Sequence, residues 1–477
     1  MTQPTLEQLE AILAPYQQQH LLAGWDTLDP TRRDQFARQL MELDFDQLAA
    51  QQQSDQSNDG PEAAEFEPAS AIRLDQASSH ALPESDRGQA KTLGEAALRD
   101  GRLAMVLVAG GQGSRLGVAY PKCMLPVGPL SERSLLEMAI DQLLAVGRRY
   151  DVEIPLRIMT SPAVHQQTAE FLDQHRQFGM SPGQCQLFCQ AVLPTLDSSS
   201  GSLLLAEPGQ LLTNPDGHGG LVQAMQAGGL LSELEELGAD LLFYAQVDNP
   251  LVQVCQPEFI GHHLAADSEM TTQVVAKTHG LERTGNLVSH AGQLRVVEYS
   301  ELPSALAEQC EEDGSLRFWA GSIAVHLFNR QLLEQAAGQA DWLPLHRAQK
   351  QVECLPPAND LLAATERTAI KFERFIFDLL PRATNPLLVE VERQAAFAPI
   401  KNDDSAESDT AELAQQAIVN LHRSWLLAAG VRIDDDLPIE IHPGWARDAE
   451  QVRQRTDLPD SISEPTYLAS DQDICEE

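Results

Sequence analysis

The stretch "MVLVAGGQGSRLG", residues 105–117, decides the fold. A short apolar run is followed by glycines at positions 110, 111, 113 and 117. A strand, a Gly-rich turn and then a helix start place backbone N–H groups where an anion can bind, at the carboxyl edge of a sheet. Glycine also removes the side chains that would block close approach of a phosphate or base. The stretch predicts an α/β protein with a phosphate site; the alternative is a tight connection with surface Arg and Lys.

Spacing excludes two familiar nucleotide motifs. A dinucleotide fingerprint counted from Gly111 and Gly113 would need a third glycine where Leu116 stands. A Walker A loop needs Lys directly after its last glycine, but Gly117 is followed by Val118. Arg115 and Lys122 remain as two cations in one short segment, and such a pair would neutralise a triphosphate.

The pattern around this stretch predicts a doubly wound sheet. Apolar, strand-like runs alternate with amphipathic helical stretches such as residues 134–150 and 163–179. This alternation is typical of βαβ units, so we expect an α/β, Rossmann-like domain with a mixed, mostly parallel sheet. Residues 286–301 alternate apolar and polar side chains around "AGQ" and predict a β-hairpin. The predicted strands are 105–109, 156–161, 185–190, 241–248 and 271–277.

Composition changes along the chain predict four segments. Residues 1–50 have helical periodicity, with a helix start at Asp29–Pro30, and form an N-terminal helical segment. Residues 51–92 are rich in Ser, Gln, Asp and Pro and are expected to be a partly mobile linker. Residues 93–385 contain the alternating pattern and are expected to form the central α/β domain. Residues 386–477 form a small C-terminal domain, with a helix over 410–429 and an acidic tail of little core-forming power.

The charge balance restricts the partners. The formal net charge is −37, from 33 Lys and Arg against 70 Asp and Glu. Such a surface repels nucleic acids and anionic membranes, so no binding to either is expected. The first residues lack a secretory signal, and no apolar run approaches the roughly 18 residues of a membrane span. Seven cysteines without a paired framework fit a reducing compartment, and we expect a cytoplasmic protein.

Eight sequence blocks in one order resemble a known family. They cover roughly residues 95–425 and are similar to the blocks of eukaryotic-type UDP-N-acetylhexosamine pyrophosphorylases and, more loosely, UDP-sugar pyrophosphorylases. The blocks are "AGGQGSRLGVAYPK" (109–122), "IMTS" (158–161), "QAVLP" (190–194), "NPDGHGGL" (214–221), "VDNPLV" (247–252), "VVEYSE" (296–301), "KFERFIFD" (371–378) and "APIKN" (398–402).

The resemblance implies that residues 93–385 are a catalytic, Rossmann-like (GT-A-like) nucleotidyltransferase domain. It also implies the activity of a uridylyltransferase, which makes a UDP-sugar and pyrophosphate from UTP and a sugar 1-phosphate. Charge neutralisation and positioning are the main demands of such a reaction. The implied nucleotide-binding residues are Val108, Ala109, Gly110, Gly111, Gln190 and Gly217, and the implied catalytic cations are Arg115, Lys122, Lys371 and Lys401. Asp248 is implied to bind Mg²⁺, and the implied sugar-binding residues are His218, Glu298, Tyr299 and Ser322.

Several of these residues have plainer interpretations. Asp248 is also a suitable helix N-cap, and Lys401 stands close enough to Asp403 and Asp404 to pair with either. Lys371 is equally a charge on a solvated strand face. Glu298 and Tyr299 are also ordinary hairpin residues, and His218 an ordinary turn residue.

Four positions depart from the family pattern and concern the sugar. His218 and Ser322 stand where the N-acetylhexosamine enzymes carry Asn, Trp319 replaces another Asn, and Cys123 replaces a Gly near the phosphate loop. A buried polar group without its partner costs about 1–3 kcal/mol, so such changes redirect specificity. We expect N-acetylglucosamine 1-phosphate as substrate, with glucose or galactose 1-phosphate as the alternative. A non-catalytic nucleotide-sugar sensor is a second alternative, and monomer and dimer both stay open.

Overall fold

The computed structural model describes residues 5–46, 48–49, 65–74, 84–339, 341–358, 363–434 and 437–470. Its contacts divide the chain into two compact units. Unit 1 comprises Met1–Glu62, Ala191–Gly220 and Leu343–Ile376, and unit 2 comprises Ala63–Gln190, Leu221–Trp342 and Phe377–Glu477. This division differs from the four consecutive segments predicted above, because two internal stretches join the N-terminal helices and the C-terminal residues join the central sheet.

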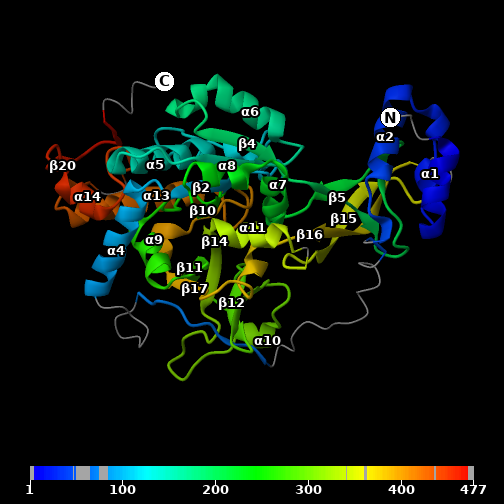
Figure 1. Cartoon of the computed structure of the whole chain (residues 1–477). Coiled ribbons are helices and arrows are strands. Elements are labelled where there is room, and N and C mark those ends of the chain that lie inside the picture. The colour runs from blue at the N-terminus through cyan, green and yellow to red at the C-terminus, as the bar shows by residue number, and fades with distance from the viewer. Residues whose placement is uncertain are drawn as a thin grey trace. The chain divides into compact units, whose positions relative to one another are not determined.

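A mixed ten-stranded sheet forms the centre of unit 2 (Figure 1). Its main path is β1-β12-β14-β10-β2-β3-β4; β11 pairs with β14 and β17, and β13 pairs with β12. The neighbours β10, β2, β3 and β4 are parallel, whereas β14 is antiparallel to β10, β11 and β12. The bounds are β1 Glu67–Pro68, β2 Leu103–Val108, β3 Leu156–Thr160, β4 Cys185–Cys189, β10 Leu241–Gln246, β11 Met270–Ala276, β12 Asn286–His290, β13 Gln293–Val297, β14 Ala320–Asn329 and β17 Leu387–Glu390.

Helices cover both faces of this sheet. Side chains of Leu103, Met105 and Leu107 on β2 pack in one core cluster with α5 (Leu135–Tyr150) and α9 (Pro257–Ala265). On the opposite face, Arg157 of β3 reaches Glu233 of α8 (Leu230–Glu236) at 3.0 Å. Arg157 is fully buried, and its hydrogen bonds to two backbone carbonyls help to offset the cost of burying its charge. The predicted doubly wound arrangement and the five predicted strands are therefore confirmed.

Helix starts follow capping chemistry. Ser134 and Glu137 form a capping box at the start of α5, and Asp29 caps α2 (Pro30–Met41) as predicted. Thr410 caps α13 (Ala411–Ala428), which confirms the predicted helix over 410–429. The stretch 163–179 is helical only in part, because α6 (His165–Gln174) ends before a 3-10 turn. The linker also ends earlier than predicted, since α4 spans Glu84–Arg99; residues 51–64 and 75–83 lie outside the described residues.

Unit 1 has its own core. Its helices α1 (Leu6–Leu13) and α2 contribute Leu9, Leu13, Phe36 and Leu40. A three-stranded sheet of β15 (His346–Cys354), β16 (Thr365–Glu373) and β6 (Leu196–Asp197) contributes Phe372 and other side chains to the same cluster. The N-terminal helices are thus integrated with chain segments far away in the sequence.

The C-terminal residues form more core than the sequence indicated. Leu426, Val431, Ile439, Trp445 and Ile462 belong to a buried cluster around the end of α13. The expectation of little core-forming power was wrong, because apolar residues spread over a long polar segment meet when short strands pair. In the part of the chain that the structure describes, no helix is long and apolar enough to cross a membrane.

Candidate nucleotide and sugar phosphate site

The Gly-rich loop leaves the carboxyl end of β2 between two parallel neighbours. Val108 pairs with Gln246 of β10 and Met159 of β3, and the Ala109 amide donates to the Met159 carbonyl. The expected α-helix does not follow. Two 3-10 turns, η6 (Ser114–Leu116) and η7 (Lys122–Met124), precede α5 instead. The loop is therefore a self-contained turn at the sheet edge, with its backbone available to a ligand.

Gly110 and Gln190 lie together at the start of this loop. A Cβ on Gly110 would lie 3.0 Å from the Gln190 Oε1 atom and 3.3 Å from the Ser161 amide. The Ser161 hydroxyl donates to the Gly110 carbonyl at 2.7 Å, and the Gln190 amide donates to Thr160. The main-chain hydrogen bond fixes the backbone of Gln190, and its side-chain oxygen lies beside the glycine backbone, where a group that reads a base edge would be needed.

Gly113 lets the loop fold tightly onto itself. A Cβ there would lie 2.2 Å from Val118 Cγ2 and 2.6 Å from the Tyr120 carbonyl oxygen. Gln112 and Pro121 form an antiparallel bridge, and the Lys122 amide donates to the Gly111 carbonyl. This fold brings Lys122 back to the glycines although it is eleven residues beyond Gly111.

Lys122 meets Asp248 at the end of the neighbouring strand. The Lys122 Nζ and Asp248 Oδ2 atoms are 3.2 Å apart, and the side chains are 15% and 19% exposed. The Asp248 carbonyl accepts from the Ile400 amide, and Lys401 is the next residue in the chain. Residues 249–256 contain turns and α9 begins at Pro257, so the N-cap interpretation of Asp248 was wrong.

Arg115 and Lys401 are exposed cations near the same loop. No described carboxylate lies within 4.0 Å of either side chain, so Lys401 does not pair with Asp403 or Asp404. Asp403 instead accepts from the amide and hydroxyl of Ser405. In a chain with a net charge of −37, exposed cations that form no ion pair within 4.0 Å among the described residues favour an anionic ligand.

Two of the predicted sugar-binding residues converge on Gly285. A Cβ on Gly285 would lie 3.6 Å from the Glu298 Oε1 atom and 3.7 Å from Ser322 Cβ. The Ser322 amide donates to the Gly285 carbonyl at 2.8 Å. Tyr299 follows Glu298 and is 48% exposed, which is unusual for a large aromatic side chain. The hairpin prediction is confirmed by the pairing of β12 with β13.

The other three predicted residues, Gly217, His218 and Lys371, belong to unit 1. Gly217 has φ of +85°, and a Cβ there would lie 2.4 Å from the Arg374 carbonyl oxygen. His218 Nδ1 accepts from the Ile376 amide, and the imidazole stacks on Phe375. Burial lowers the pKa of His218 to about 4, so the imidazole is neutral at neutral pH. Lys371 is a half-buried residue of β16 opposite Ala348.

A family model described as UTP–glucose-1-phosphate uridylyltransferase matches residues 45–435. The chain belongs to this family. "UDP-N-acetylglucosamine diphosphorylase 2" of Arabidopsis thaliana is 31% identical over 90% of this chain and 86% of its own length. "UDP-N-acetylhexosamine pyrophosphorylase-like protein 1" of Homo sapiens is 31% identical over 95% of this chain and 90% of its own. The chain is accordingly a nucleotidyltransferase.

Solved structures agree with the fold. A putative UDP-N-acetylglucosamine pyrophosphorylase from Entamoeba histolytica has a TM-score of 0.75 at 28% identity, covering 85% of this chain and 100% of that one. The uridine diphosphate N-acetylglucosamine pyrophosphorylase from Trypanosoma brucei has a TM-score of 0.80 at 23% identity, covering 97% and 98%. The predicted fold class is therefore confirmed.

The donor set around Asp248 fits a substrate-borne magnesium ion. Among the described residues no cluster of three or more acidic, His or Cys side chains forms a metal cage. Mg²⁺ is usually held by one or two carboxylates together with substrate phosphates, so the single half-buried carboxylate of Asp248 is compatible with it. Lys122 contacts that carboxylate, so a cation stands beside the single acidic group of this site.

The departures from the family pattern have different explanations. Cys123 is fully buried in the core with its Sγ 3.8 Å from the Thr168 hydroxyl, and burial raises its pKa to about 11. It faces the core rather than a ligand. Trp319 packs under the Arg73 guanidinium, 3.6 Å from the ring centre. Ser322 lies near Glu298, another predicted sugar residue, and the fourth departure, His218, belongs to unit 1.

Sequence reasoning missed two supporting residues of this site. Ser161 orients Gly110, and Asn249 holds the 396–398 segment through the Ala396 carbonyl and Ala398 amide. Both directly follow a strand or stand next to a predicted site residue, in the blocks "IMTS" and "VDNPLV". Their block membership was the available signal.

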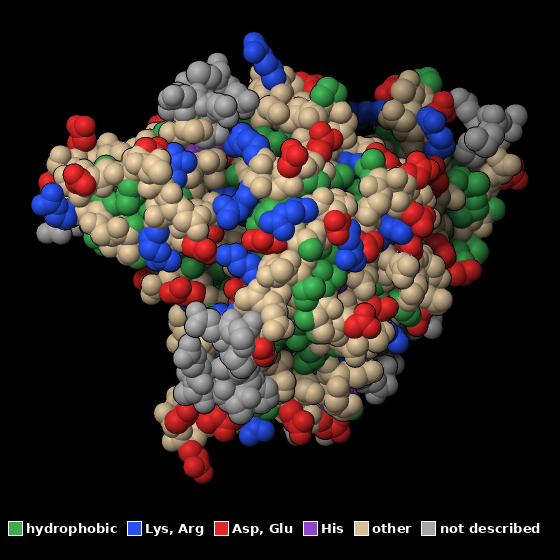
Figure 2. Space-filling view, turned by 60° about the vertical axis from the view of Figure 1, so that its left-hand side comes forward, with side chains coloured by type: hydrophobic (Ala, Val, Ile, Leu, Met, Phe, Trp, Pro, Cys, Tyr) green, Lys and Arg blue, Asp and Glu red, His purple; other side chains and the backbone are tan. Residues whose placement is uncertain are grey.

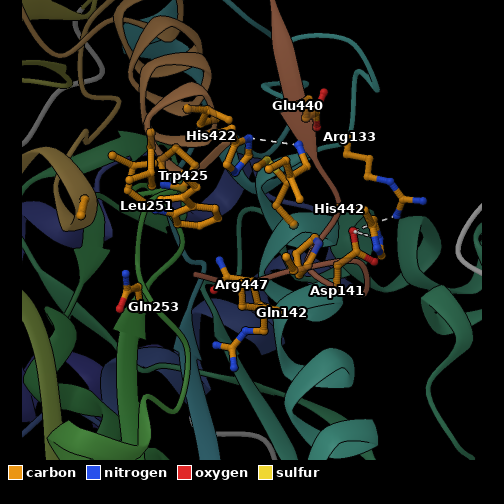
Figure 3. A pocket seen from close by; sticks show the side chains of 18 of the residues that line it. Arg133, Asp141, Gln142, Leu251, Gln253, His422, Trp425, Glu440, His442 and Arg447 are labelled. Atoms are coloured by element: carbon orange, nitrogen blue, oxygen red, sulfur yellow. Dashed lines mark hydrogen bonds and ion pairs between the residues drawn. The ribbon is translucent and has the colours of Figure 1, made fainter. Parts of the chain in front are cut away.

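A cavity lies in unit 2, away from the predicted site residues (Figure 3). It has a volume of about 60 Å³, and no predicted site residue lines it. Figure 3 shows Arg133 and His442 beside Asp141, and Arg133 Nη1 is 2.8 Å from the Asp141 carboxylate.

Figure 2 shows Asp and Glu side chains spread over one face with Lys and Arg among them, so the acidic side chains do not form a single patch on that face.

Proposed function

We propose that the chain transfers the uridylyl group of UTP to N-acetylglucosamine 1-phosphate, forming UDP-N-acetylglucosamine and pyrophosphate. The observation that carries this proposal is the contact of Lys122 with Asp248 where the parallel strands β2 and β10 end. The printed names of relatives that cover most of the chain support the choice of sugar.

The chemistry is an in-line displacement at phosphorus. An oxygen of the sugar phosphate forms a bond to the α-phosphorus of UTP, and the bond from that phosphorus to the bridging β-oxygen breaks. Pyrophosphate leaves with the electron pair, so no general base is required. The protein's work is to align the two phosphates and to offset their negative charge.

The loop residues divide this work. The backbone from Val108 to Gly111 would contact uridine, with Gln190 beside it to read the base edge. Arg115 and Lys122 would bind the triphosphate and stabilise the leaving pyrophosphate, as unpaired or half-buried cations at the sheet edge are suited to do. Lys401 would neutralise the α-phosphoryl charge.

Asp248 would hold Mg²⁺ together with the phosphates of UTP. Bound there, the ion would polarise phosphoryl oxygens and offset the charge that develops as pyrophosphate leaves. The Lys122 ammonium contacts the Asp248 carboxylate and orients it toward the loop.

Sugar selection would rest on Glu298 and Ser322, with Tyr299 as an exposed contact. Glu298 would accept hydrogen bonds from sugar hydroxyls, and Ser322 lies beside Gly285. Because Ser322 lacks the amide of the Asn that the N-acetylhexosamine enzymes carry, glucose 1-phosphate or galactose 1-phosphate is a second candidate substrate. The roles of Gly217, His218 and Lys371 in unit 1 stay predictions.

Pyrophosphate release tests the proposal. Purified full-length protein is incubated with UTP, Mg²⁺ and N-acetylglucosamine, glucose or galactose 1-phosphate in parallel. We expect the highest kcat/KM with the N-acetyl sugar. Preference for glucose or galactose 1-phosphate would overturn the sugar assignment alone. Tight UDP-sugar binding by folded protein without release from any sugar would overturn the enzyme assignment in favour of a sensor.

A cytoplasmic location also stays a proposal, supported by the free cysteines among the described residues. Fractionation with a secreted and a cytosolic marker protein tests it.

A further inference from the structure

Lys277 is a buried ammonium beside the proposed sugar residues. It follows the end of β11, is 7% exposed and has no described carboxylate within 4.0 Å. Glu282, the acidic residue whose charge acts on Lys277, is bound instead by the Arg393 guanidinium and by the Thr278 amide and hydroxyl. Burial lowers the pKa of Lys277. A buried cation without an ion pair is costly, so its retention needs a reason.

The ammonium acts on Asn286. Lys277 Nζ donates to the Asn286 Oδ1 atom in a short hydrogen bond and to the Gly280 carbonyl at 3.3 Å. Asn286 is 1% exposed, and its Nδ2 donates weakly to the carbonyls of Val297 and Thr284, at 3.4 and 3.5 Å. Lys277 therefore fixes which way the Asn286 amide points.

The two carbonyls belong to the residues that precede the sugar residues. Val297 stands directly before Glu298, and Thr284 directly before Gly285. The Thr284 hydroxyl is buried and makes no hydrogen bond, so it does not hold this turn. Gly321, directly before Ser322, packs so closely that a Cβ would lie 3.2 Å from Lys277 Cγ. All three residues around the proposed sugar subsite thus lie one residue from a contact of the Lys277–Asn286 pair.

We propose that Lys277 is a positioning residue for the sugar 1-phosphate, acting through Asn286 to set the spacing of Gly285, Glu298 and Ser322. The inference rests on the proposed function and adds to it a residue that does not itself contact the reacting phosphates. It separates sugar recognition from nucleotide recognition, since none of the contacts above involves the loop of residues 108–122.

Steady-state kinetics of Lys277→Met and Asn286→Asp test the proposal. Met has a similar length without the charge, and Asp keeps a partner for the ammonium but cannot donate to the Val297 and Thr284 carbonyls. We expect both variants to raise the KM for the sugar 1-phosphate at least tenfold and to leave the KM for UTP within twofold. Lys91→Met, which removes an exposed lysine paired with Glu450, is the matched control and should change neither constant.

Three outcomes would overturn the proposal: both KM values unchanged, both raised equally, or an unchanged sugar KM in folded Asn286→Asp. If Lys277→Met fails to fold, as judged by thermal unfolding, Asn286→Asp decides. Failure of the wild type to release pyrophosphate with any sugar overturns the proposed function instead, and the wild-type arm distinguishes the two.

Discussion

At the residue scale, Lys122 and Asp248 show most clearly what the sequence could predict and what only the structure shows. Each was identified by its block, but their 3.2 Å contact was not predicted. Pairing between residues 126 positions apart depends on the register of two parallel strands, which no local pattern encodes. Cys123 shows the reverse: its position in the sequence placed it near the phosphate loop, but its side chain faces the core.

Replacing Lys122 with Met should lower kcat about a hundredfold, because one preorganised cation is lost from the developing pyrophosphate charge. The thermal midpoint should fall by only a few degrees, since the Asp248 carboxylate keeps 19% exposure and water can solvate it. Pyrophosphate release measures kcat and calorimetry the midpoint, with Lys91→Met as control. Wild-type turnover in the variant would refute the assigned role.

Ala324 is strained in β14. It has φ of +55°, a left-handed conformation unfavourable for a residue with a Cβ, beside an irregularity in the β11–β14 pairing. Ala324→Gly should therefore raise the free energy of unfolding by about 0.5 kcal/mol. Ala320→Gly in the same strand, where φ is not positive, should lower it by about 1 kcal/mol. Chemical denaturation of both variants measures this, and a destabilised Ala324→Gly contradicts it.

At the element scale, the strands and capped helices followed from local patterns, but the segment after the Gly-rich loop did not. The helical expectation after Gly113 failed because the chain turns back to place Lys122 beside Gly111.

The C-terminal strand β19 (Ile439–Ile441) holds the turn that contains Leu130 and Ser131. The Glu440 carboxylate, 3% exposed, accepts from the Leu130 and Ser131 amides and the Ser131 hydroxyl at 2.6–2.8 Å.

Glu440→Gln should destabilise the chain by about 2 kcal/mol, because a charged acceptor of three hydrogen bonds becomes a neutral group with one oxygen. Urea denaturation measures the change. Glu450→Gln is the matched control and should cost at most about 0.5 kcal/mol, since Glu450 is 52% exposed and makes a surface ion pair. Equal effects of the two substitutions on the free energy of unfolding would show that Glu440 does not anchor the turn that contains Leu130 and Ser131.

At the scale of the whole molecule, periodicity predicted the α/β class, and the ordered blocks predicted the family. The division into two units was not predictable in the same way, because residues 191–220 and 343–376 join the N-terminal helices through contacts distant in sequence. For the same reason the C-terminal residues were undervalued: Trp445 and Ile462 are buried only once short strands pair.

Stability should fall in acid because buried histidines are neutral in the folded chain. Burial lowers the pKa of His263 to about 4 and of His422 to about 3, from 6.5. Between each folded pKa and 6.5, the unfolded chain binds more protons than the folded chain, so the free energy of unfolding decreases as pH falls below 6.5. Each histidine contributes up to about 1.4 kcal/mol per pH unit. Denaturation curves from pH 7 to 4.5 measure this, and constant stability would contradict it.

The most direct test of the central claim is pyrophosphate release from UTP and N-acetylglucosamine 1-phosphate by the wild type and by Asp248→Asn. Asn keeps the size of Asp248 but removes the charge that contacts Lys122 and that, in the proposed function, would bind the magnesium of UTP. The account predicts release by the wild type and at least a hundredfold slower release by the variant. Equal rates for the two proteins, or no release by folded wild type, would contradict it.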